Sequence, residues 1–123
     1  MTSVAISPPN AIVFVLDPAN KKAVIPEYLA GNLIAATETC VSVGTQDSVD
    51  GETQVTLKFD DSTLPFLHPI FSGAVATPNG KIAIVTAELQ RVLELDVPTE
   101  KVSISIWVDD LQNPARVIVI VAS

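Results

Sequence analysis

The chain has 123 residues, of which 48% are hydrophobic and 17% are charged. One domain usually spans about 100 to 150 residues, so we expect a single domain over residues 1–123. The apolar share suffices for a packed core and argues against an intrinsically disordered chain. Fourteen acidic against seven basic residues give a formal net charge of −7. That sign disfavours phosphate backbones and anionic lipids, so we expect neither nucleic acid nor a membrane as partner.

Strand-like alternation of apolar and polar residues begins near the N-terminus and recurs to the C-terminus. Turn pairs such as Asp50-Gly51 and Asn79-Gly80 punctuate it. A helical turn is favoured only at 26–30, with at most one further turn at 86–92. The expected strands, in chain order, are residues 3–7, 11–17, 33–36, 39–44, 53–59, 70–77, 81–86, 91–97, 102–109 and 115–122. This spacing predicts an all-β fold, an antiparallel β-sandwich of about eight to ten short strands with at most one short helical turn.

Cysteine and histidine are too scarce for several kinds of site. Cys40 is the single cysteine and His68 the single histidine, so disulfides within the chain and zinc sites built from several such ligands are excluded. A lone thiol suits a reducing compartment. The first residues lack a secretory pattern, and the longest apolar runs, 11–16 and 117–122, have six residues, too few to span a bilayer. We therefore expect a soluble, cytoplasmic protein without cofactors.

His68 is the only side chain that readily exchanges a proton near neutral pH. A small hydrolase could combine it with Ser62 or Ser72 and with Asp60 or Asp61, but no nucleophile-elbow pattern surrounds any serine. A loop histidine is the favoured interpretation. The chain is accordingly expected not to be an enzyme.

Cys40 lies in an alternating run that places it on one face of a strand with Ser42 and Gly44. A reactive thiol needs an electropositive setting, whereas the nearest charged residues here are the acids Glu38 and Asp47. We interpret Cys40 as a quiet sheet residue.

Acidic turns are the most plausible ligand-binding feature in this chain. The carboxylates gather in three loops, formed by Asp47, Asp50 and Glu52, by Asp60 and Asp61, and by Asp109 and Asp110. Such loops at the end of a sandwich can bind calcium, and one alternative is a calcium-responsive sandwich in which the second and third loops share an end. No regular calcium-binding ladder of aspartates occurs, so solvated acidic turns are favoured and no metal residue is assigned.

Trp107 lies opposite the face that carries Ile104, Ile106 and Val108, beside small polar serines. An outward tryptophan followed by Asp109 is typical of an interaction anchor. Coverage of both faces of this strand explains the pattern equally well.

The C-terminal run is apolar on both faces. Burial on both sides is the favoured interpretation, and a homodimer through the strand from Arg116 to Val121 is the alternative.

The order of the segments resembles a known bacterial family. The segments are VAIS (4–7), IVFV (12–15), LAG (29–31), VSVGT (41–45), TPNGKI (77–82), VLELDVP (92–98) and VSISIW (102–107). This order is similar to the competence protein J family, small bacterial β-sandwich inhibitors of a nuclease, and to uncharacterised relatives. The resemblance implies a non-enzymatic protein that covers the basic active cleft of another protein. It supplies no inhibitory residue that can be matched here.

The favoured function is therefore a non-catalytic protein-binding module, an inhibitor or immunity-like partner of a basic enzyme such as a nuclease. Its acidic charge would steer such a partner toward it. The expected partner-binding residues are Trp107, Asp109, Asp110, Asp47, Asp50 and Glu52.

Overall fold

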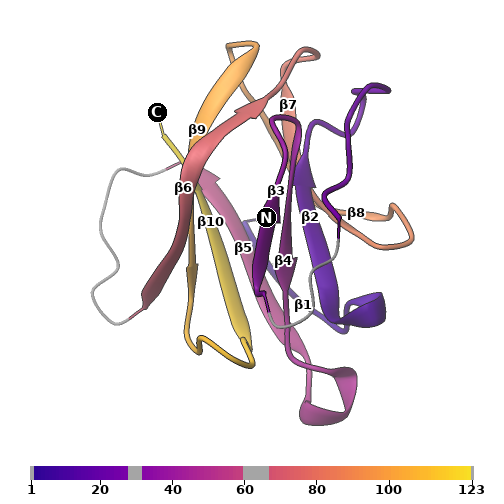
Figure 1. The fold of residues 1–123 in the computed structure, drawn as a ribbon, viewed down its shortest axis with the longest axis vertical. Helices are drawn as coiled ribbons and strands as arrows, with labels where there is room; N and C mark the ends of the chain where they lie inside the picture. Colours follow the sequence, from indigo (N-terminus) through magenta and orange to yellow (C-terminus); the bar gives the residue numbers. More distant parts are fainter. Residues whose placement is uncertain (1, 28–31, 60–66, 123) are drawn as a thin grey trace.

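Two five-stranded β-sheets pack face to face in the computed structural model, which describes residues 2–27, 32–59 and 67–122 (Figure 1). The first sheet has the strand order β1-β5-β10-β9-β6, and the second has β3-β4-β2-β7-β8. The strands are β1 (Ser3–Ile6), β2 (Ile12–Leu16), β3 (Ile34–Ala36), β4 (Cys40–Gly44), β5 (Thr53–Phe59), β6 (His68–Ala76), β7 (Lys81–Thr86), β8 (Arg91–Asp96), β9 (Lys101–Val108) and β10 (Arg116–Val121). The predicted all-β sandwich is confirmed.

All ten expected strands are present, and no observed bound departs from the expected one by more than two residues. The helical segments differ. The described residues contain no α-helix but two 3-10 turns, η1 (Pro9–Ala11) and η2 (Ser48–Asp50). The candidate at 26–30 is not helical at Pro26 and Glu27 and otherwise lies outside the described residues. In the segment at 86–92, a hydrogen-bonded turn joins the end of β7 to the start of β8.

Alternation along the strands builds the core between the sheets. In β9, Ile104, Ile106 and Val108 face inward and are nearly or fully buried, as expected. They join one hydrophobic cluster with inward residues of the second sheet such as Val13 and Ile84. A smaller apolar cluster occupies the other face of the second sheet, at Phe14, Leu16, Cys40, Ala83 and Val85.

One strand pairing is parallel. The two strands β5 and β10 run side by side in the same direction, with Arg116 opposite Gln54 and Val121 opposite Phe59, whereas every other pairing among the described residues is antiparallel. The sequence predicts an antiparallel sandwich, and the pairing of β5 with β10 is an exception within it. The long chain between these strands contains four further strands, so it can return β10 to the same starting end as β5. Consequently the loops that precede β5 and β10 lie at one end of the sandwich.

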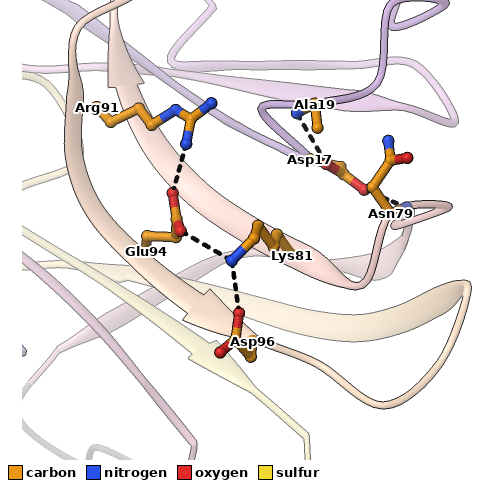
Figure 2. A network of polar contacts seen from close by, with 7 residues as sticks. All are labelled: Asp17, Ala19, Asn79, Lys81, Arg91, Glu94 and Asp96. Carbon is orange, nitrogen blue, oxygen red and sulfur yellow. Dashed lines mark hydrogen bonds and ion pairs between the residues drawn. The ribbon is translucent and has the colours of Figure 1, made fainter.

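The opposite end is fixed by polar contacts (Figure 2). The carboxylate of Asp17 is fully buried and accepts hydrogen bonds from the backbone N–H groups of Ala19 at 3.0 Å and Asn79 at 2.7 Å. These bonds tie the end of β2 to the turn between β6 and β7. In that turn Gly80 has φ +73°, a left-handed conformation that glycine adopts at low cost.

Burial of Ile106 in the core predicts that truncating this side chain destabilises the fold. Ile106→Ala removes apolar volume from a site that is fully buried, so it should lower the free energy of unfolding by about 2 to 5 kcal/mol in urea denaturation. Ile25→Ala, at a side chain that is 46% exposed, is the control and should change it by less than about 1 kcal/mol. Equal effects of the two substitutions would contradict this assignment of the core.

Candidate functional site

Two acidic loops lie side by side where β5 and β10 begin, at the lower end in Figure 1. The backbone N–H of Gln46 donates to the carbonyl of Pro114 at 2.8 Å, and the side-chain amide of Asn113 lies 3.5 Å from a carboxylate oxygen of Asp50. We call this surface the acidic end. Its carboxylates are Asp47, Asp50, Glu52, Asp109 and Asp110.

Two of these carboxylates shape the loop between β9 and β10. Asp109 accepts hydrogen bonds from the backbone N–H groups of Ala115 and Arg116, both at 3.0 Å. Asp110 accepts from Gln112 at 2.8 Å and Asn113 at 2.9 Å. All four bonds reach Oδ1, so within the described chain the Oδ2 atom of each residue is left for another donor.

The loop before β5 is built in a similar way. Asp47 caps η2, because its carboxylate accepts from the backbone N–H of Val49 at 3.2 Å. The buried side chain of Gln46 donates to the carbonyl of Glu52 at 2.8 Å and so closes the loop beneath the turn. Asp47, Asp50 and Glu52 are exposed around this turn.

Two large apolar side chains project from the same loops. Val49 is 87% exposed at η2, and Leu111 is 56% exposed next to Asp110. Neither residue was predicted from the sequence. Each is an isolated apolar residue among polar loop residues, outside any alternating strand, and that is the signal that could have identified it. Apolar tips among carboxylates give the acidic end the composition of a protein-binding surface.

Charge is unevenly distributed over the molecule. No ion pair within the described residues involves a carboxylate of the acidic end. By contrast, Lys81 at the opposite end pairs with Glu94 at 3.2 Å and Asp96 at 2.8 Å (Figure 2). Five of the seven basic residues lie toward that opposite end, namely Lys21, Lys22, Lys58, Lys81 and Lys101. Over the described ranges, the acidic end therefore combines five carboxylates with one basic residue, Arg116, whereas the opposite end mixes its acids with most of the lysines.

Trp107 lies on the outer face of the first sheet, next to the acidic end. Its cross-strand neighbours are Ile118 on β10 and Pro69 on β6. The indole N–H donates to the hydroxyl of Ser105 at 3.1 Å, and the residue is half-buried. The residue thus lies between the two interpretations of the sequence, an outward interaction anchor and a ring covered on both faces, because it is neither fully buried nor fully exposed.

The hydrolase alternative finds little support in the described residues. His68 is exposed at the start of β6, and Ser72 is four positions along the same strand. Four strand residues span about 13 Å, which is far beyond hydrogen-bonding distance. Ser62, Asp60 and Asp61 lie outside the described residues.

Cys40 is completely buried on the outer face of the second sheet. Burial raises the pKa of its thiol to about 12, so it is almost wholly protonated near neutral pH. The expectation of a quiet sheet residue agrees with this setting, although desolvation rather than neighbouring acids raises the pKa.

The calcium alternative is not tested at two of its four residues, since Asp60 and Asp61 lie outside the described part of the chain. Among the residues that are described, no group of three or more acidic, histidine or cysteine side chains could hold a metal ion. The hydrogen bonds of Asp109 and Asp110 are explained by loop closure.

The C-terminal strand is buried on both faces, with Val117, Val119 and Val121 in the core and Ile118 and Ile120 at most 7% exposed. It also has paired neighbours on both sides. A homodimer through Arg116–Val121 stays a prediction. Within the described residues, no helix is long and apolar enough to cross a membrane.

Comparisons with known proteins give one informative match. No family model matches the chain, and no curated protein matches it either. Among solved structures it is similar to ComJ from Bacillus subtilis, an inhibitor of the DNA degrading activity of NucA, with a TM-score of 0.74 over 100% of this chain and 96% of ComJ. The chain has the fold of ComJ. Sequence identity is 14%, so the expected resemblance is confirmed for the fold.

Asp109→Ala tests the construction of the acidic end. It removes two backbone hydrogen bonds and should lower the free energy of unfolding by about 1 to 3 kcal/mol in urea denaturation. Glu52→Ala is the control, because no hydrogen bond to the Glu52 carboxylate occurs within the described chain, and it should be nearly neutral. A neutral Asp109→Ala variant would show that these bonds do not hold the loop.

The hydrogen bonds that the Asp110 carboxylate accepts predict that the stability of the fold depends on pH. The backbone N–H groups of Gln112 and Asn113 hold the pKa of its carboxyl below the ordinary value, and the charge of His68 acts in the same direction. A carboxyl whose pKa is lowered by folding stabilises the fold when ionised, and that stabilisation is lost as the pH falls through the folded-state pKa. The stability difference between the native chain and Asp110→Ala should therefore shrink below about pH 4. A difference that stays constant from neutral to strongly acidic pH would refute this.

Proposed function

We propose that this protein is a non-catalytic inhibitor of a basic enzyme that degrades DNA, and that it binds this enzyme through the acidic end. The observation that carries the proposal is the union of two acidic loops on one surface. An enzyme that binds DNA has a cationic cleft for phosphates, and a carboxylate-rich surface is complementary to such a cleft.

The geometry supports a binding role in two ways. Three of the five carboxylates, those of Asp47, Asp109 and Asp110, are held by backbone hydrogen bonds, which limits the ordering that binding would require of them. Val49 and Leu111 supply apolar contact area within the charged rim, where steering charges alone would give fast but weak association. The fold shared with ComJ, itself an inhibitor of a DNA degrading activity, agrees with this role.

Trp107 is included as a lateral contact of this surface. Because it is half-buried beside Ile118, Trp107→Ala should affect both stability and binding, rather than binding alone. A cytoplasmic location belongs to the same proposal, since the lone buried thiol suits a reducing compartment.

The test is affinity capture from a lysate of the source cells at low and high salt, followed by an assay of DNA degradation by the recovered protein. We expect a stoichiometric basic protein that is released as salt rises and whose DNA degradation is inhibited by the chain. Recovery of a partner that does not degrade DNA, or of the chain alone, would contradict the proposal.

Substitutions that remove carboxylate charges test whether the acidic end is the partner-binding surface. Asp50→Asn combined with Glu52→Gln should slow association with the captured enzyme by about tenfold at low salt and flatten its salt dependence. The matched control is Glu38→Gln combined with Glu100→Gln, which removes two exposed charges at the opposite end. Equal effects of the two pairs would show that net charge, rather than the acidic end, governs binding.

A further inference from the structure

A groove of about 650 Å³ adjoins the acidic end on the outer face of the second sheet. It is lined by apolar side chains from β2, β3 and the connecting loops. The apolar lining includes Ile12, Phe14, Leu33, Ala35, Ala87 and Leu111. Pockets that bind small molecules typically measure about 300 to 1,000 Å³, so this groove has ample room for an aromatic or branched side chain.

The groove is continuous with the acidic end. Leu111 and Gln112, which line it, follow directly after Asp109 and Asp110, and Thr45 lines it two residues before Asp47. The backbone N–H of Thr45 donates to the carbonyl of Ala11, another lining residue, at 2.8 Å. The same backbone that holds the carboxylates therefore forms one wall of the groove.

Charge complementarity defines the occupant. None of the lining residues of the described chain is a lysine or arginine, while exposed carboxylates stand beside the groove. An anionic ligand would meet uncompensated repulsion here, and a cationic segment would be attracted. An apolar side chain flanked by basic residues would pack against the apolar lining while the basic residues pair with the neighbouring carboxylates.

Resting on the proposed function, we infer that the groove receives an apolar side chain from a cationic segment of the partner protein. The carboxylates of the acidic end contact the flanking basic residues, and the inserted side chain displaces water from Phe14, Leu33 and Leu111. Insertion of one anchor into a preformed apolar pocket is the usual origin of a binding hot spot.

Defined peptides test this inference without the partner. The probe is a capped peptide in which lysines flank one phenylalanine, titrated into the isotope-labelled chain and followed by backbone amide NMR. It should shift the amide signals of the groove-lining residues and bind about tenfold more tightly than the same peptide with alanine at the centre. A third peptide, with glutamates around the phenylalanine, should not bind.

Two variants place the anchor. Ala35→Leu adds a branched side chain to the groove lining and should reduce the difference between the phenylalanine and alanine peptides, whereas Ala36→Leu, on the other face of the same strand, should preserve it. Leu111→Ala changes an exposed side chain with little risk to folding and should weaken phenylalanine-peptide binding several-fold, with Ile25→Ala as its control.

Several results would overturn the inference: equal binding of the phenylalanine and alanine peptides, equal binding of the glutamate peptide, or signal shifts confined to other surfaces. Concentration-dependent dimerisation that Ala35→Leu abolishes would overturn it as well, by assigning the groove to a second copy of the chain. Inhibition of a captured nuclease without peptide binding would leave the proposed function standing and reject the groove. Peptide binding without any inhibited nuclease would support the groove as a binding site and reject the proposed function.

Discussion

The parallel pairing of β5 with β10 is the constraint on which the acidic end depends. Each strand is preceded by an acidic loop, and the pairing starts both strands at the same end, with Arg116 opposite Gln54. An antiparallel pairing would separate the loops by the length of the sheet. The hydrogen bond between Ala115 and Gln54 extends this pairing into the loop, and the one between Gln46 and Pro114 joins the loops themselves.

Local polar contacts then turn this placement into a defined surface. The carboxylates of Asp47, Asp109 and Asp110 satisfy backbone N–H groups that would otherwise be unpaired at a cap or a loop. The same carboxylates that close the loops therefore also place negative charge on this surface. The opposite end has acids as well, but there Lys81 pairs with Glu94 and Asp96, and most of the basic residues lie at that end. This contrast gives the molecule one distinct face for a cationic partner.

The strands were predictable because their signal is local. Alternation in β9 gives the inward positions of Ile104 and Ile106, and the Asn79-Gly80 pair marks the turn before β7. The parallel pairing was not predictable, since β5 and β10 are far apart in sequence and nothing in either strand specifies the direction of its neighbour. The five carboxylates were predicted from the sequence as partner-binding residues, a role that stays a prediction, and their proximity emerges only from the topology. Val49 and Leu111 were missed because the exposure of a loop residue depends on what packs against it.

Hydrogen–deuterium exchange of the chain with and without the captured enzyme tests most directly whether the acidic end is the binding surface. Binding there predicts slower exchange in the loops at 45–52 and 109–115, including the amides of Asp50 and Gln112, with little change around Lys81 and Lys101. Slower exchange confined to the opposite end, or to the strands around Trp107, would contradict it.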